Sequence, residues 1–163
     1  LFESGAILLC LAGKTGKLYP ADLRGRCAAA QGLIWQMGGL GPMAGQNHHF
    51  RMYAPEKLPY AIERYTREAH RLYGVLDRRL AGREYICDEY SIVDMACWPW
   101  TILHERQGIT ISEFPNLQRW LEKMKTRPGV QRGFDAAKEL RNASAAGPDE
   151  EAKKILFGQT GQR

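Results

Sequence analysis

The sequence has no hydrophobic run long enough to cross a membrane. Its longest apolar stretch, residues 6–12, is well short of the roughly 18 to 20 residues that a membrane-spanning helix needs. The stretch follows Glu3 rather than a positively charged segment, so it does not resemble a secretory leader. Hydrophobic residues make up 44% and charged residues 25% of the 163 positions. This composition is typical of a globular protein, and we expect no membrane partner.

A block of basic residues is also missing. The net charge is +5, but the lysines and arginines are spread along the whole chain. Nucleic-acid-binding domains concentrate such charge on one face or in one tract, often beside aromatic residues. We therefore expect no nucleic-acid partner.

Paired cysteines are absent as well. The four cysteines are Cys10, Cys27, Cys87 and Cys97, and no two of them form a Cys-x-x-Cys motif. Cys10, Cys27 and Cys97 lie in apolar or helix-like stretches, which indicates small side chains in a core. The simplest setting is a reducing one, which predicts a cytoplasmic protein.

The histidines do not have the spacing of metal ligands. His48 and His49 are adjacent, and His70 and His104 lie far from them in sequence. Two ligands on one helix face are three or four residues apart, because only those positions point the same way. The sequence therefore predicts no metal site.

Apolar residues recur at helical spacing along most of the chain. The clearest case is residues 59–80, where Ile62, Tyr65, Ala69, Leu72 and Leu76 follow one another at steps of three and four. No segment alternates as a strand does. The predicted fold class is all-α, with helices at about residues 4–14, 22–37, 59–80, 91–105, 115–126 and 128–140. A polar tail from 141 carries a short helix at 149–156.

The second of these helices is expected to begin after Asp22, a good N-cap residue, and to end in a run of glycines. Residues 39–44 have the letters of the dinucleotide-binding motif G-x-G-x-x-A. They follow a helix rather than a strand, however, and Pro42 stands where that motif needs a flexible backbone. We interpret the run as a helix break, followed by a polar, aromatic loop at residues 46–50.

Ser91 and Asp94 have the spacing of a capping box. A serine at the N-cap and an acid three residues later satisfy backbone donors at the start of a helix. A catalytic serine–aspartate pair is the alternative, because His104 follows in the sequence. No oxyanion-stabilising motif accompanies the pair, which favours the structural interpretation.

Glu3 and Ser4 open the first predicted helix. The first turn of a helix leaves N–H groups unpaired and carries a partial positive charge, so it attracts carboxylates. A serine hydroxyl adds a donor there, and a neighbouring glutamate can accept an ammonium group. The pair would suit the zwitterionic end of an amino acid. From these two residues alone, a plain N-cap beside a helix-stabilising acid is the simpler interpretation.

Five longer runs carry a family resemblance: LFESGAILL at residues 1–9, WQMGGLGPM at 35–43, GQNHHF at 45–50, YAIERY at 60–65 and YSIVDMACWPW at 90–100. Together they resemble the glutathione transferase superfamily, most closely its bacterial nu-class, disulfide-reductase-like branch. The capping box recurs in many transferase classes, whereas the second and third runs are specific to this branch.

The resemblance implies a thioredoxin-like N-terminal domain followed by a helical C-terminal bundle, in a homodimer that uses glutathione for conjugation or disulfide reduction. By this resemblance, residues 1–19 are the last helix of the first domain, residues 20–140 the helical domain and residues 141–163 a polar tail. We expect the chain to be N-terminally truncated relative to the family. The alternative is a non-catalytic helical module for interaction or dimerisation.

The same resemblance implies a glutathione site. Glu3 and Ser4 match the pair that holds the γ-glutamyl group. Arg64 lies in a stretch that supplies an arginine to glutathione on the opposite subunit, and Arg71 is its rival. The group that activates the thiol lies in the missing part of the first domain, so the catalytic residue is unknown and we expect this part alone to be inactive. Residues 47–50 and Trp100 are candidates for the second-substrate pocket.

Overall fold

The computed structural model describes residues 1–136, 138 and 149–158. Over these residues the secondary structure is helical without any strand, and Cys87 and Glu89 form only an isolated bridge. The all-α prediction is therefore confirmed. In the described part of the chain, no helix is long and apolar enough to span a membrane. Contacts divide the chain into two compact units, Leu1–Met124 and Lys125–Arg163. The predicted boundaries at residues 19 and 140 stay a prediction, because they assign the segments to domains of the family rather than to compact units of this chain.

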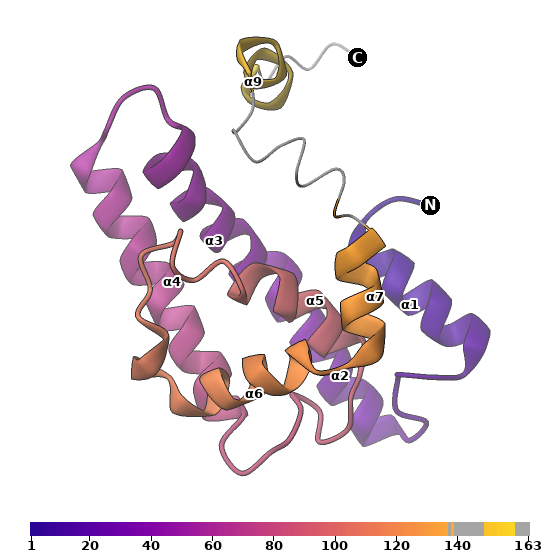
Figure 1. Ribbon diagram of the computed structural model, residues 1–163. Coiled ribbons are helices and arrows are strands. Elements are labelled where there is room, and N and C mark those ends of the chain that lie inside the picture. The colour runs from indigo at the N-terminus through magenta and orange to yellow at the C-terminus, as the bar shows by residue number, and fades with distance from the viewer. Residues whose placement is uncertain (137, 139–148, 159–163) are drawn as a thin grey trace. The chain divides into compact units, whose positions relative to one another are not determined.

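The first unit holds most of the helices, which Figure 1 shows in chain order. They are α1 (Ser4–Thr15), α2 (Leu23–Trp35), the π-helix η1 (Gln36–Leu40), α3 (Gly41–His48), the π-helix η2 (His49–Tyr53), α4 (Pro59–Arg79), α5 (Ile92–Thr101), the 3₁₀-helix η3 (Ile111–Glu113) and α6 (Pro115–Lys125). Helix α3 packs along α4, and α5 contacts α1, α2 and α3.

The second unit contains α7 (Pro128–Ala136) and α9 (Glu150–Phe157). Pro128 begins α7 as predicted, since a proline suits the first helical turn. The short helix expected near 149 is also confirmed, and Asp149 caps it by accepting a hydrogen bond from Ala152 N–H at 2.8 Å. The predicted end of the preceding helix near 140 and the tail at 141–148 lie outside the described residues.

Helix α1 has the predicted bounds within one residue, and Gly16 ends it in the left-handed conformation at φ 65°. The glycine fits this C-cap position because it has no Cβ to clash there. Only Gly5 and Ala12 of the helix are buried. Its larger apolar side chains are exposed, among them Ile7 at 38% and Leu11 at 53%. Helix α1 is therefore poorly buried in this chain.

Residues 23–53 form one long bent helix, so the predicted break at residues 39–44 is wrong. Asp22 caps its start as expected, accepting from Gly25 N–H at 2.8 Å. The glycines do not stop the helix, because η1 widens one turn and Gly41 N–H donates to Gln36 C=O, five residues back. The wider turn accommodates Pro42, which has no N–H to give.

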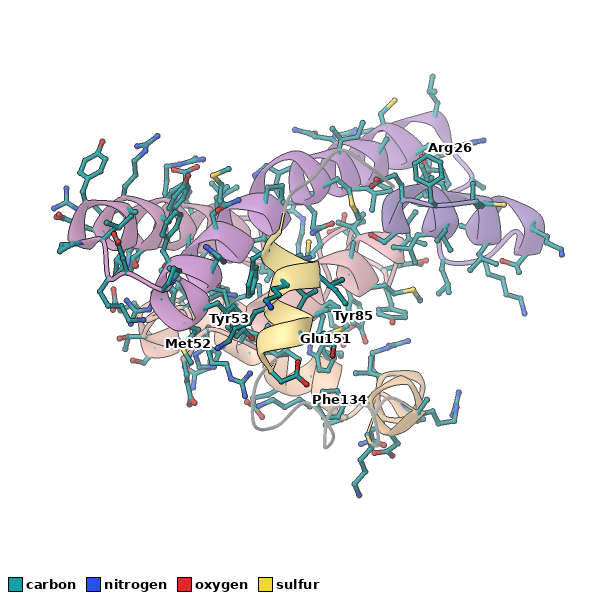
Figure 2. All side chains as sticks on the ribbon, turned by 90° about the horizontal axis from the view of Figure 1, so that it is seen from above. Arg26, Met52, Tyr53, Tyr85, Phe134 and Glu151 are labelled. Carbon is teal, nitrogen blue, oxygen red and sulfur yellow. The ribbon has the colours of Figure 1, made fainter. Side chains whose placement is uncertain are left out.

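The segment 46–50, predicted as a loop, is helical too. Asn47 is fully buried. Its Nδ2 donates to the Gln107 carbonyl at 2.8 Å, and its Oδ1 accepts from Thr66 Oγ1 at 3.0 Å. Interior partners therefore satisfy the polar side chain that had suggested a loop. The π-helix η2 then ends the long helix at Met52 and Tyr53, which lie well apart from Arg26 near its start (Figure 2).

Helix α5 ends at Thr101 rather than near residue 105 as predicted. The Trp100 carbonyl is bonded by the side chain of Gln107, whose Nε2 donates to it at 2.8 Å. His104 N–H, which the next helical turn would direct to that carbonyl, donates to Thr101 C=O at 3.2 Å instead. The chain consequently leaves the helix and continues in turns.

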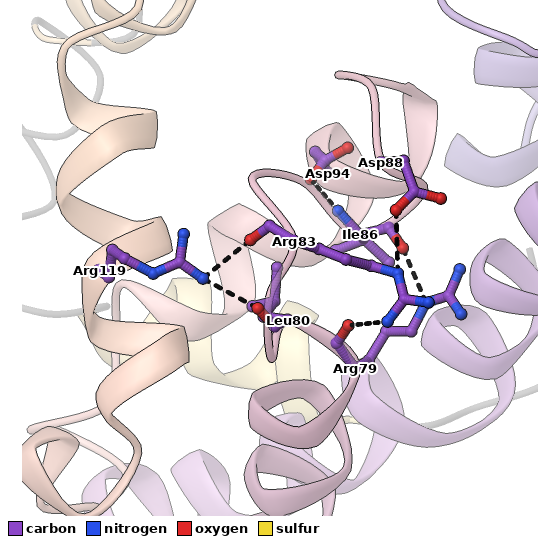
Figure 3. A network of polar contacts seen from close by, with 7 residues as sticks. All are labelled: Arg79, Leu80, Arg83, Ile86, Asp88, Asp94 and Arg119. Carbon is purple, nitrogen blue, oxygen red and sulfur yellow. Dashed lines mark hydrogen bonds and ion pairs between the residues drawn. The ribbon is translucent and has the colours of Figure 1, made fainter.

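The connection between α4 and α5 is held by arginines that bond backbone carbonyls. Arg79 Nε donates to Ile86 C=O at 2.8 Å. Arg119 on α6 donates to the carbonyls of Leu80 and Arg83, both at 2.8 Å (Figure 3). These bonds satisfy backbone carbonyls in an irregular segment, where no regular secondary structure supplies hydrogen-bond donors.

The predicted capping box is confirmed, and Asp94 does more than cap. Its carboxylate accepts from Ser91 N–H at 3.0 Å and Ser91 Oγ at 3.1 Å. It also accepts from Ile86 N–H at 3.1 Å and from Trp120 Nε1 on α6 at 2.9 Å. Burial raises the pKa of Asp94, and these hydrogen bonds oppose that rise. His104 does not join Ser91 and Asp94, because its Nδ1 lies 3.3 Å from the Ile109 carbonyl oxygen.

Replacing Asp94 with alanine is expected to destabilise the fold strongly. The change leaves the buried donors of Ser91 and Trp120 without an acceptor, which costs about 3 kcal/mol or more of unfolding free energy. Urea unfolding followed by circular dichroism measures the loss. Glu63→Ala is the matched control, because that carboxylate is 60% exposed in its ion pair with Arg67 on α4 and should change stability by less than about 1 kcal/mol. Equal effects of the two variants would contradict this role of Asp94.

Candidate functional site

The N-terminus of α1 presents free backbone donors next to a strained residue. The first helical hydrogen bond is donated by Ile7 N–H to Glu3 C=O at 2.9 Å, so the amides of Ser4, Gly5 and Ala6 precede the helical ladder. Glu3 has φ 69° and ψ 112°, and its side chain makes no capping bond. A non-glycine residue at positive φ is unfavourable, and such strain is concentrated at functional sites.

A groove of about 390 Å³ lies beside this helix start. It is lined by one residue of α1, by the π-helix η1 and the adjoining α3, and by one residue of α5: Ser4, Gln36, Met37, Gly41, Pro42, Gly45, Gln46 and Trp100. Ser4 Oγ lies 3.7 Å from Met37 Sδ across the groove. The structure therefore brings Ser4 together with Trp100, the candidate for the second-substrate pocket.

Trp100 lies directly on two glycines of α3. A Cβ at Gly41 would be 3.3 Å from the indole ring, and a Cβ at Gly45 would be 3.4 Å from it. Residues with a side chain at these two positions would push the indole ring away from α3. The glycines that resembled a nucleotide-binding motif therefore allow α5 to approach α3 closely.

A buried polar network fixes Trp100 from behind. Gln107 Nε2 donates to the Trp100 carbonyl, and Gln107 Oε1 accepts from Tyr73 OH at 2.8 Å. Burial raises the pKa of Tyr73, so the hydroxyl stays a proton donor throughout the physiological range. These bonds hold the backbone at Trp100, from which the indole projects toward the groove.

Gln36 is the groove residue that sequence reasoning missed. It is 2% exposed, and its Oε1 has no hydrogen-bond partner among the described residues. A glutamine within a helical pattern carries no signal of this state, because the π-turn that turns it inward depends on tertiary packing. Asn47, which was a second-substrate candidate, belongs instead to the buried network described above.

Arg64 and Arg71 are both exposed on α4, and neither lines the groove. Arg71 is already paired: its Nε and its terminal nitrogen donate to the two carboxylate oxygens of Glu68 at 2.8 and 2.7 Å. Arg64 makes no hydrogen bond to another described residue and influences Glu68 only through its charge. Within one chain, then, neither arginine is brought to Ser4.

The cysteines do not supply a reactive thiol at the groove. Cys97 is fully buried as predicted, and burial raises its pKa well above the usual value. Cys87 is half-buried, and burial raises its pKa too. Cys10 and Cys27 are exposed, so the interpretation of both as core side chains is wrong. Both cysteines lie on exposed faces of their helices. Helical periodicity alone did not distinguish these faces from buried ones.

A larger cleft of about 740 Å³ lies at the other end of α1, between residues 16–28 and 79–91. Two of its arginines are already engaged. Arg83 pairs with Asp88 at 3.0 Å, and Arg79 bonds the Ile86 carbonyl. The smaller groove is the better candidate, because it contains the free helix amides at Ser4 and an unpaired carboxamide. Across the described residues, no cluster of histidine, cysteine and acidic side chains could hold a metal ion.

The geometry defines a class of protein: a helical domain built on one long bent helix, with a ligand groove between that helix and the start of a preceding helix. Residues 42–128, just over half of the chain, match the family model of the glutathione S-transferase C-terminal domain. The chain therefore belongs to the glutathione S-transferase family, as the resemblance predicted.

Individual relatives agree with this assignment. The disulfide-bond oxidoreductase YfcG of Escherichia coli is 53% identical over 131 residues, which are 80% of this chain and 61% of that protein. The transcriptional regulator URE2 of Saccharomyces cerevisiae is 33% identical over 170 residues, with 80% of this chain and 48% of that protein covered. A glutathione transferase from Burkholderia graminis, solved with two glutathione molecules per subunit, is similar with a TM-score of 0.79 at 46% identity. That match covers 85% of this chain and 61% of the other. The chain thus spans about three fifths of the length of this oxidoreductase and of this transferase.

Two glycine substitutions should separate the close approach of Trp100 from ordinary helix propensity. Gly41→Ala places a Cβ 2.8 Å from Gln36 Nε2 and 3.3 Å from Trp100, and such overpacking is expected to destabilise by about 1 to 3 kcal/mol. Gly38→Ala meets nothing within 4 Å and should be neutral or stabilise by up to about 1 kcal/mol. Urea unfolding of both variants measures the difference. A stabilising Gly41→Ala would disprove the contact.

Proposed function

We propose that this chain is the larger part of a cytoplasmic enzyme that uses glutathione, either to conjugate electrophiles or to reduce disulfides. The observation that carries the proposal is the groove in which Ser4, at the open N-terminus of α1, faces Met37 and shares the lining with Trp100. Membership of the glutathione S-transferase family supports it, and so do the names of the oxidoreductase and transferase relatives.

The γ-glutamyl end of glutathione fits the start of α1. Its carboxylate would accept from the amides of Ser4 and Gly5 and from the Ser4 hydroxyl, where the helix dipole favours negative charge. Its ammonium group would pair with the carboxylate of Glu3, which makes no capping bond. Glu3 and Ser4 are adjacent at this helix start, so both groups would be within reach of one ligand.

The rest of glutathione would extend from Ser4 toward the groove. For reaction, its thiol must become a thiolate, because the thiolate is the nucleophile. None of the groove residues is placed to stabilise a thiolate by charge. By the family resemblance, that donor belongs to the first strand and turn of the thioredoxin-like domain, so the residues described here bind and orient the ligand rather than activate it.

The proposed enzyme is a homodimer in which Arg64 reaches the glutathione of the opposite subunit. Two features support Arg64 over Arg71. The Arg64 guanidinium has no hydrogen-bond partner among the described residues, whereas Arg71 is held by both carboxylate oxygens of Glu68. A guanidinium that is already bidentate must break two charge-assisted bonds before it can bind a ligand.

A non-catalytic helical module is the second candidate function. It is favoured by one observation, the 33% identity to a protein named as a transcriptional regulator. A full-length gene product that binds glutathione without turning over any electrophile or disulfide would favour this candidate over the enzyme.

Ser4→Ala in the full-length protein is expected to raise the KM for glutathione about tenfold or more, because a hydrogen bond to a charged carboxylate is lost. Steady-state kinetics with a model disulfide, at varied glutathione, measures this. Ser112→Ala removes an exposed hydroxyl elsewhere and serves as the control. The proposal fails if turnover does not depend on glutathione at all.

Arg64→Met and Arg71→Met should differ in the same assay. Loss of Arg64 is expected to raise the glutathione KM about tenfold, as for other charge-assisted hydrogen bonds, while loss of Arg71 should change it less than twofold. The reverse order would assign the role to Arg71. Mixing an Arg64→Met subunit with a Ser4→Ala subunit should restore part of the activity if the contact crosses the dimer.

A further inference from the structure

Gln36 is the exception among the buried polar residues of this fold. The structure describes six of them: Gln36, Asn47, Ser91, Asp94, Thr101 and Gln107. The other five have hydrogen bonds within the protein. Of these six, Gln36 alone has a buried side-chain atom, Oε1, that lacks a partner among the described residues. A buried amide without partners is unfavourable, so an unpaired one calls for a ligand or another explanation.

Gln36 is one of the residues that line the groove, together with Ser4 and Trp100. Its Nε2 lies against Gly41, where a Cβ would be only 2.8 Å away. The missing side chain at Gly41 therefore leaves room for the amide group itself. The nitrogen of the amide lies against Gly41 and the unpaired atom is the oxygen, so the group can accept a hydrogen bond from an N–H of a molecule in the groove.

Asn47 shows that a buried amide on the long helix is not unpaired in general. It lies on the same helix and is equally buried, yet both ends of its amide are bonded, to Gln107 and to Thr66. The difference is the surroundings: Asn47 faces the interior between α3 and α4, whereas Gln36 faces the groove.

We propose that the Gln36 carboxamide hydrogen-bonds an amide group of the second substrate, while the indole of Trp100 packs against an apolar part of it. The substrate class that fits is a disulfide bearing peptide-like amides. A substrate without an amide leaves the carboxamide of Gln36 unpaired, and a site with unpaired polar groups discriminates against such molecules. This inference deepens the proposed glutathione-dependent function and rests on it.

Two matched probes test the inference in the full-length gene product: the bis(N-methylamide) of dithiodiglycolic acid and its dimethyl ester. They differ in an N–H group replaced by oxygen. In each, the glutathione thiolate attacks one sulfur, the S–S bond breaks and one probe thiol leaves. A second glutathione then releases the other probe thiol and forms glutathione disulfide. The kcat/KM of each probe is divided by its uncatalysed rate with glutathione.

The corrected kcat/KM is expected to favour the amide over the ester about tenfold in the wild type, which corresponds to one hydrogen bond to a buried group. A ratio near one, with glutathione-dependent turnover of both probes, overturns the inference and leaves the proposed function standing. Absence of turnover of both probes is instead the failure of the proposed function, and the inference falls with it.

Gln36→Met keeps the length of the side chain and removes its hydrogen-bonding groups, so it should lower the amide-to-ester ratio to about one. Gln118→Met is the matched control on the exposed face of α6 and should keep the wild-type ratio. Trp100→Leu should raise the KM of both probes alike. Gln36→Leu replaces Gln36→Met if circular dichroism shows that the latter does not fold. A Gln36 variant that folds and keeps the tenfold ratio overturns the inference.

Discussion

The contact between the Trp100 indole and the two glycines of α3 is the constraint on which the groove depends. A Cβ at Gly41 or Gly45 would meet the ring at 3.3 or 3.4 Å, which is closer than most side-chain contacts. At these two positions the absence of a side chain lets α5 approach the long helix closely. The π-turn before them absorbs Pro42 without ending the helix, so one run of residues supplies both the bend and the close approach. The width of the groove follows from this packing.

The N-terminal end of α5 is fixed by hydrogen bonds to a buried carboxylate rather than by close packing. Asp94 is buried and gathers donors from the cap, from the preceding loop and from Trp120. The rise of its pKa on burial records the cost of desolvating a carboxylate, and the donors reduce that cost. Because a ten-residue helix is held at its first turn by Asp94 and at its last turn by the Gln107 network, Trp100 is positioned by the interior rather than by the surface.

The sequence predicted the parts of this fold that local chemistry decides. The cap at Asp22, the box at Ser91 and the proline that begins α6 depend on neighbouring residues alone, and the structure confirms each. The glycine run was misread because its role depends on Trp100, which is far away in the sequence. Gln36 could not be predicted for the same reason. Glu3 and Ser4 were ambiguous as a dipeptide and gained meaning only from the family resemblance, since a helix start looks alike with or without a ligand.

Two unfavourable local features of the first unit lie at or beside the groove. Glu3 holds a backbone conformation that costs on the order of 1 to 3 kcal/mol, and an unpaired amide such as that of Gln36 costs about as much. Together they are a substantial fraction of the roughly 5 to 15 kcal/mol by which a domain is stable. Neither is compensated by a contact within the described residues. A ligand that carries an amino-acid end and an N–H group would give hydrogen-bond partners to the carboxylate of Glu3 and the carboxamide of Gln36, and those bonds would offset part of this cost. Selectivity for such a ligand would follow, because a purely apolar molecule of the same size would make neither bond.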